Sequence, residues 1–219
     1  MFNKALFTIT LTLSLLTATT FKDITPNPTD KMLENQRNAK LCSSPVVANE
    51  EIREDFKYGC FCGSNYPNID KNSTKDFRKL TYEQRIKTIE SYYKIKPYDD
   101  IDTVCQQHDI CYLYQGKKAK ICNNLIYDDL HLLVDSFKEK NDKIENKQCQ
   151  YLSYDIASVF KTIFTPVDDE VGMFDFGMRM FTTTITVANK TFEESVDTII
   201  EQGPRYPKEN HKCLKPKLQ

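Results

Sequence analysis

The sequence predicts a mostly helical fold that disulfide bonds hold together, and three observations support this prediction. Residues 102–112 contain neither glycine nor proline, as expected of a helix. Residues 120–145 carry apolar side chains at helical spacing. Eight cysteines, an even number, all follow an apolar N-terminal leader. In an exported chain such a set indicates four disulfides rather than a cytosolic metal site.

The leader occupies residues 1–20. It contains one lysine, Lys4, and then an apolar run over residues 5–16 that is too short to span a bilayer. We therefore expect a signal peptide, with Ala18 and Thr20 as the small residues near the cleavage site. An uncleaved anchor is the alternative, because the match to a small-x-small site is imperfect. No later segment offers about 20 uninterrupted apolar residues, so we predict a secreted mature chain without a transmembrane span.

The mature chain, residues 21–219, has the length of one ordinary domain. The whole sequence has 30 basic and 31 acidic residues, a net charge of −1, which becomes −2 when Lys4 leaves with the leader. This balance recruits neither nucleic acid nor an anionic membrane. The sequence makes no prediction about the oligomeric state.

The N-terminal half contains two segments that precede the central helix. Residues 23–48 are polar and proline-containing, and we expect an arm that Cys42 tethers. Residues 50–58 form a short, charged helix candidate. Residues 68–98 are expected to form a surface cap that includes an amphipathic helix at residues 80–93.

The central helix places four side chains on one stripe. Cys105, His108, Asp109 and Tyr112 follow one another at i, i+3, i+4 and i+7. A histidine beside a carboxylate can be a catalytic base, since its pKa near 6.5 suits neutral pH. The alternative is a solvated pair on a disulfide-bonded helix. We interpret the other two histidines, His131 and His211, as surface residues.

The second helix, residues 120–145, also carries polar groups on its apolar face. The apolar residues predicted to share this face are Leu125, Ile126, Leu130, Leu132, Leu133 and Phe137. Asp129 lies on the same face, and Asn123 lies at its edge. A carboxylate on an apolar face needs a hydrogen-bonded partner. For Asp129 that partner is either a catalytic network or a structural group such as Tyr112.

The C-terminal part is less regular. Residues 141–150 are interpreted as a charged linker, residues 151–164 as a third amphipathic helix and residues 192–202 as a last helix. No structure is predicted for residues 168–187. Their methionines and phenylalanines, between Met173 and Phe181, are interpreted as buried core or as a lipid-contacting surface.

Two motifs resemble the secreted, calcium-dependent phospholipase A2 family. The first is the Tyr-Gly-Cys-Phe-Cys-Gly sequence of residues 58–63, and the second is Cys-x-x-His-Asp-x-Cys-Tyr at residues 105–112. They stand in the family's order, and the resemblance covers residues 57–63 and 102–130. It implies two antiparallel helices joined by disulfides, a calcium loop, and a phospholipase A2-like domain with a C-terminal extension at residues 151–219. The implied activity is lipid degradation, namely hydrolysis of the sn-2 acyl ester of glycerophospholipids at a membrane or micelle surface.

The resemblance also implies a site. His108 would activate water, and a calcium ion on Asp109 would stabilise the oxyanion. The other calcium ligands would be the backbone carbonyls of Phe61, Gly63 and Asn65, where Asn65 stands in place of the family's glycine and Tyr66 is an alternative.

The chain departs from the family in how it orients His108. Asn123 occupies the position of the family's aspartate, and Asp129 is the other candidate for that role. The resemblance pairs Cys62 with Cys105 and Cys111 with Cys122. Three pairings remain open for the other four cysteines: Cys42, Cys60, Cys149 and Cys213.

Two alternatives compete with this interpretation. A zinc site of Cys105, His108 and Asp109 is disfavoured, because an exported chain favours disulfides and zinc would leave the 58–63 motif without a purpose. A catalytically weak or inactive member of the family, acting as a lipid- or protein-binding toxin or effector, is supported by the departures at Asn65 and Asn123. The joint presence of His108, Asp109 and Tyr112 argues against it.

Overall fold

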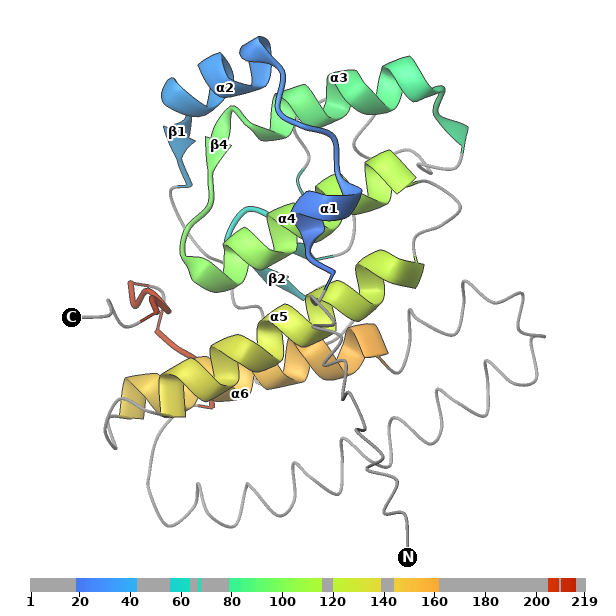
Figure 1. The fold of residues 1–219 in the computed structure, drawn as a ribbon. Helices are drawn as coiled ribbons and strands as arrows, with labels where there is room; N and C mark the ends of the chain where they lie inside the picture. Colours follow the sequence, from blue (N-terminus) through green and yellow to red (C-terminus); the bar gives the residue numbers. More distant parts are fainter. Residues whose placement is uncertain are drawn as a thin grey trace, which may run out of the picture.

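Four helices form the body of the described part of the protein. They are α3 (Tyr82–Tyr92), α4 (Asp100–Gln115), α5 (Lys120–Lys138) and α6 (Ile144–Val159). In the computed structural model they lie beside one another in chain order, each antiparallel to the one before it (Figure 1). α5 packs between α4 and α6, and α3 covers the other side of α4. The described part is mostly helical, as predicted.

The structure describes residues 19–42, 56–63, 67, 79–115, 120–138, 144–161, 205–208 and 210–215. The predictions for the leader up to residue 18, for residues 168–187 and for the helix at 192–202 lie outside these ranges. Among the described helices, none has the length and apolar character needed to cross a membrane.

The core lies between α4, α5 and α6. Ile101, Leu133 and Leu152, one from each helix, have no solvent exposure. Burying a side chain of this size contributes about 1.5–3 kcal/mol. The apolar face predicted for α5 is buried, with one exception. Leu132 is 62% exposed, because it lies two residues, or about 200°, from the buried Leu130.

The N-terminal arm contains more regular structure than predicted. α1 (Phe21–Ile24) packs on α4, and α2 (Asp30–Arg37) packs on α3. The Thr29 hydroxyl caps α2 by accepting a hydrogen bond from Met32 N at 3.2 Å. This cap, with Asp30 in the first turn, was the available signal in the sequence.

The arm and the predicted insertion are joined in one layer over α4. After α2, strand β1 (Lys40–Leu41) pairs in parallel with β4 (Ile95–Lys96), which follows α3. The predicted helix at 80–93 is α3, and Thr81 and Gln84 form a capping box at its start. The described part of the insertion, residues 79–98, therefore packs on α4 and α2 through α3.

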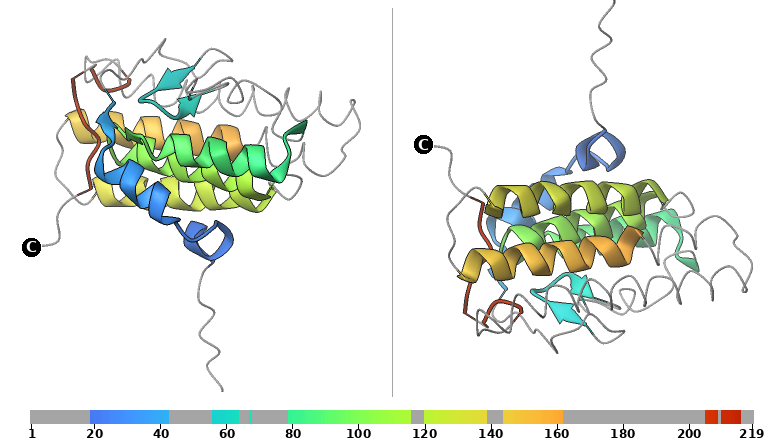
Figure 2. Two further views of the ribbon diagram at one scale, coloured as in Figure 1. Left: turned by 90° about the horizontal axis from the view of Figure 1, so that it is seen from above. Right: turned by 90° about the horizontal axis from the view of Figure 1, so that it is seen from below.

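Two predicted boundaries are wrong. Residues 57–58 belong to strand β2 (Lys57–Tyr58), which pairs antiparallel with β3 (Cys62–Gly63), rather than to a helix. The hairpin lies on the side of the helices opposite α2 (Figure 2). The predicted linker at 141–150 is helical from Ile144 onward. α6 starts early because Gln148 and Cys149 are buried while Glu145 stays exposed, which is an amphipathic pattern.

All eight cysteines form disulfides. Cys62–Cys105 and Cys111–Cys122 are present as predicted. The remaining four cysteines form Cys42–Cys60 and Cys149–Cys213, a choice that the sequence left open. The first of these two ties the N-terminal arm to the β2–β3 hairpin. The second ties α6 to the C-terminal strap, which we define as residues 205–208 and 210–215.

Candidate functional site

Helix α4 presents the predicted site residues, and Asp99 starts this helix. Its Oδ1 accepts a hydrogen bond from Asp102 N at 3.0 Å, and its backbone carbonyl accepts one from Thr103 N. A carboxylate at this position also complements the positive end of the helix dipole. Asp100 and Asp102 add negative charge to the first turn.

His108 is held by a hydrogen bond from one side. Its Nε2 lies 3.0 Å from Asn123 Oδ1, and the Tyr112 hydroxyl donates to the same oxygen at 2.6 Å. Because an amide oxygen only accepts, this arrangement assigns the proton to Nε2 and the lone pair to Nδ1. Burial lowers the pKa of His108 to about 4, although the hydrogen bond to Asn123 acts in the opposite direction. The imidazole is therefore neutral at pH 7.

Two aromatic rings fix the plane of the imidazole. The Tyr112 ring lies 4.5 Å from the His108 ring, and the Phe160 ring lies 4.4 Å from it in an edge-to-face contact. Phe160 directly follows α6, so the end of this helix covers His108. This contact could not be predicted from the sequence, because it depends on how α6 packs along α5.

Asp109 stands beside the open nitrogen of His108. Its Oδ1 lies 3.6 Å from His108 Nδ1, while its Oδ2 is buried and has no hydrogen-bond partner. Burial raises the pKa of Asp109 well above its usual range, and the nearby Asp102 carboxylate raises it further. A buried carboxylate oxygen without a partner is costly. It is suited to a hard cation such as calcium, which binds oxygen ligands.

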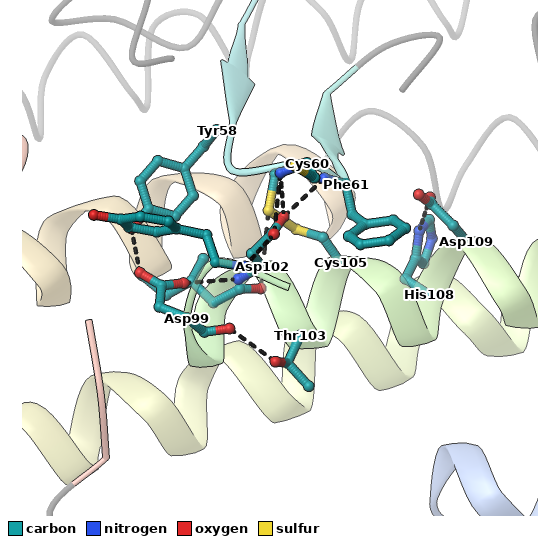
Figure 3. Close-up of a disulfide and its surroundings, with 12 residues drawn as sticks. Tyr58, Cys60, Phe61, Asp99, Asp102, Thr103, Cys105, His108 and Asp109 are labelled. Atoms are coloured by element: carbon teal, nitrogen blue, oxygen red, sulfur yellow. Dashed lines mark hydrogen bonds and ion pairs between the residues drawn. A yellow bond between two sulfur atoms is a disulfide. The ribbon is translucent and has the colours of Figure 1, made fainter. Parts of the chain in front are cut away.

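Two hydrogen bonds to Asp102 and a disulfide fix the β2–β3 hairpin against α4. Figure 3 shows Phe61, at the end of the loop of residues 58–63, next to the His108–Asp109 pair. The Cys62–Cys105 disulfide fixes the loop to α4 one turn before Asp109. The loop that contains Phe61 and Gly63 is therefore anchored to the helix that carries Asp109.

Both glycines of the loop are required by its geometry. Gly59 has φ 61° and Gly63 has φ 143°, which are conformations that other residues rarely adopt. A Cβ at Gly59 would collide with the Asp102 carboxyl, and one at Gly63 would collide with the backbone carbonyl of Phe56. The lack of a side chain at Gly59 thus lets the loop approach α4, and the lack of one at Gly63 lets the two strands of the hairpin lie close together.

Asp102 is the functional residue that the sequence analysis missed. It is fully buried, and its carboxylate accepts hydrogen bonds from Cys60 N, Phe61 N and Tyr98 N at 2.8–3.0 Å (Figure 3). Burial raises the pKa of Asp102 to about 6, while these three bonds oppose the rise. Asp102 holds the loop against α4. Its place one heptad before Asp109 was the available signal.

The structure brings some predicted site residues together and leaves others apart. His108, Asn123 and Asp109 are joined, with Tyr112 as an additional partner. Asp129 is not brought to His108. It is partly exposed, and its pKa is raised by burial and lowered by the charge of Lys215.

Asn65 and its alternative Tyr66 lie outside the described residues. The alternative zinc site would lack its thiolate ligand, because the sulfur of Cys105 is bonded to Cys62. Two clusters of potential metal ligands occur among the described residues, but their cysteines are likewise disulfide-bonded to each other. The only donor set with an unsatisfied buried oxygen in the described site is therefore the one around Asp109.

Comparisons of the chain with protein-family models, with curated proteins and with solved structures found no match. The fold and the site define a disulfide-bonded helical protein with a buried histidine that lies between an amide and a buried carboxylate. This description follows from the contacts of His108 with Asn123 and Asp109.

Proposed function

We propose that the protein is a secreted, calcium-dependent phospholipase A2-like enzyme. The observation that carries the proposal is the pair of facing groups on α4. His108 offers an unprotonated Nδ1, and 3.6 Å away Asp109 offers a carboxylate with one buried, unpartnered oxygen. Ester hydrolysis needs both a base for water and a positive charge at the developing oxyanion.

In the proposed reaction, His108 first accepts a proton and later returns it. Nδ1 of His108 takes a proton from water, and the water oxygen bonds to the sn-2 carbonyl carbon of a glycerophospholipid. When the tetrahedral intermediate collapses, the bond to the alcohol oxygen breaks and Nδ1 returns the proton to that oxygen. The products are a fatty acid and a lysophospholipid. Asn123 keeps Nε2 protonated and the ring in place throughout.

A calcium ion, when bound, supplies the positive charge that the ester oxyanion and the substrate phosphate need. Asp109 and the carbonyls of Phe61 and Gly63 would hold it, with Asn65 or Tyr66 as a further ligand. Asp102 supports this assignment because it binds the backbone N–H groups of Cys60 and Phe61, which precede the Phe61 carbonyl. The four disulfides agree with a secreted protein that works at a phospholipid surface.

One observation favours the alternative of a catalytically weak binding module. His108 is only 5% exposed, and Phe160 packs on its ring. A substrate must reach Nδ1 past these side chains. In the binding alternative, the same helices present a lipid- or protein-binding surface without turnover.

The test is release of fatty acid from mixed phospholipid vesicles, with calcium and with a chelator. We expect calcium-dependent release by the wild type and at least about 100-fold slower release by His108→Gln, the usual loss for a general base. Calorimetric titration should show calcium binding by the wild type and by His108→Gln, but not by Asp109→Asn. Equal release by the wild type and His108→Gln would favour the binding module. Equal calcium affinity of the wild type and Asp109→Asn would show that the cation lies elsewhere.

A further inference from the structure

The C-terminal strap is anchored along α6 at two places. Arg205 forms paired hydrogen bonds with the Asp155 carboxylate at 2.9–3.0 Å, and the Tyr206 hydroxyl donates to the same carboxylate at 2.7 Å. Arg205 and Asp155 are largely buried, so water screens this pair little. Further along, Cys213 is bonded to Cys149. The strap is thus fixed to α6 at both ends.

The strap also binds the start of α4. Cys213 N donates to Asp99 Oδ2 at 2.9 Å, and the Cys213 carbonyl accepts from Asp100 N at 3.2 Å. The Tyr98 hydroxyl donates to the His211 carbonyl at 3.3 Å. Both backbone groups of Cys213 are therefore used in contacts with the residues that begin α4.

Asp99 links this contact to the 58–63 loop. Its Oδ2 accepts hydrogen bonds from Cys213 N and from the hydroxyl of Tyr58, the first residue of the loop. Its Oδ1 accepts from Asp102 N, and Asp102 in turn accepts from Cys60 N and Phe61 N. One buried carboxylate thus contacts the strap, the loop and the residue that holds the loop, and Figure 3 shows its contacts with Tyr58 and Asp102.

This carboxylate depends on all of its donors. Asp99 is 4% exposed, and burial raises its pKa, while the hydrogen bonds from Asp102, Tyr58 and Cys213 oppose the rise. A buried carboxylate that loses a donor must protonate, admit water or move. Each of these changes disturbs the hydroxyl of Tyr58, which shares the same oxygen.

We propose that Asp99 is a positioning residue for the cation site and that the C-terminal strap, through Cys213, keeps it in place. The strap is then a remote part of the site: it touches neither His108 nor Asp109 in this scheme, yet it sets the rigidity of the loop. The part of the proposal that concerns calcium affinity rests on the proposed function; the part that concerns the loop does not.

The experiment compares hydrogen exchange of the loop amides with calcium affinity in one set of variants. Asp99→Asn retains a good helix cap but replaces one accepting oxygen with a donor. Cys149→Ala/Cys213→Ala releases the strap from α6. We expect at least about tenfold faster exchange across residues 56–63 in both variants, the effect of losing one hydrogen bond to a charged group. Calcium affinity should fall by a similar factor.

Two controls separate this effect from general loss of stability. Leu133→Ala opens a cavity in α5, and Arg205→Gln removes the strap anchor at Asp155 while Cys149–Cys213 remains. Both should lower the unfolding midpoint and leave loop exchange under native conditions within about twofold of the wild type, since neither removes a partner of Asp99. If the double cysteine variant does not fold, Tyr58→Phe, which removes one hydroxyl, replaces it.

Unchanged loop exchange in Asp99→Asn overturns the inference, and so does equal acceleration in Leu133→Ala. If the wild type binds no calcium, the proposed function fails, and loop exchange still decides the role of Asp99. If the wild type binds calcium and exchange accelerates without loss of affinity, the strap holds the loop but does not support the cation site, and the proposal is wrong in that part.

Discussion

At the scale of single residues, the proposed mechanism gives the amide of Asn123 a role for which a carboxylate is better suited. Asn123 Oδ1 accepts from both His108 Nε2 and the Tyr112 hydroxyl, so it fixes the tautomer of the imidazole. An uncharged amide cannot stabilise the imidazolium that forms when the base takes a proton. In the proposed reaction, Asn123 therefore orients the imidazole of His108 but does not compensate its positive charge.

This difference predicts an order of activities. Asn123→Ala should slow fatty-acid release about tenfold, less than His108→Gln, because the base remains but is no longer oriented. Asn123→Asp should match or exceed the wild type, because it adds the missing charge. Asp129→Asn is the control and should leave the rate unchanged. Initial rates on vesicles at saturating calcium measure all four. A large loss in Asp129→Asn with a silent Asn123→Ala would move the orienting role to Asp129.

Burial of His108 also predicts a pH dependence of stability. Its pKa is about 4 in the folded protein and near 6.5 when unfolded, so the unfolded state binds more protons between these values. The free energy of unfolding therefore falls as the pH falls, and His108 contributes about 2 kcal/mol of the loss between pH 7 and pH 5.

Urea unfolding of the wild type and His108→Gln at both pH values measures this contribution as a difference. The comparison with the variant is needed because Asp109, with its raised pKa, acts in the opposite direction. Parallel losses in the two proteins would show that His108 does not titrate as a buried base.

At the scale of elements, the end of α6 closes one side of the imidazole. Phe160→Ala should expose His108 and raise its pKa from about 4 toward the usual 6.5, because less desolvation opposes the charged form. An NMR titration of the imidazole protons measures this shift. Phe160→Leu keeps most of the volume and should show a smaller rise. An unchanged pKa in Phe160→Ala would mean that other groups account for the burial.

The elements also show which features the sequence can predict. α4 and α5 follow from helical spacing, and the stripe of Cys105, His108 and Asp109 was visible because residues on one helix have fixed relative positions. Such local rules do not bring Asn123 to His108, since that contact depends on the packing of α5 on α4.

Contacts between distant segments account for what was missed. The choice of Cys149–Cys213 among three pairings depends on where the strap lies, and its partners are 64 residues apart. The role of Asp102 depends on a loop about 40 residues before it, and Gly59 permits the close approach of that loop. The spacing of residues along the sequence does not show which distant segments lie in contact in the folded protein.

At the scale of the whole molecule, the disulfides contribute to stability in unequal amounts. Cys62–Cys105 spans 43 residues and Cys111–Cys122 spans 11, so chain entropy assigns them about 4 and about 3 kcal/mol respectively. Replacing either pair with alanine should lower the free energy of unfolding accordingly. Only loss of Cys62–Cys105 should also abolish calcium binding, because it releases the loop. Chemical denaturation and calorimetry measure the two effects. Equal loss of calcium binding in both variants would remove the special role of Cys62–Cys105.

The hydrogen bond from Cys213 N to Asp99 can form only late in the synthesis of the chain. Cys213 leaves the ribosome 114 residues after Asp99, and the 58–63 loop is made earlier still. Until that late cysteine arrives, the Asp99 carboxylate lacks one donor and the loop lacks its remote support. In our scheme the nascent chain therefore binds calcium about tenfold more weakly until synthesis has passed residue 213.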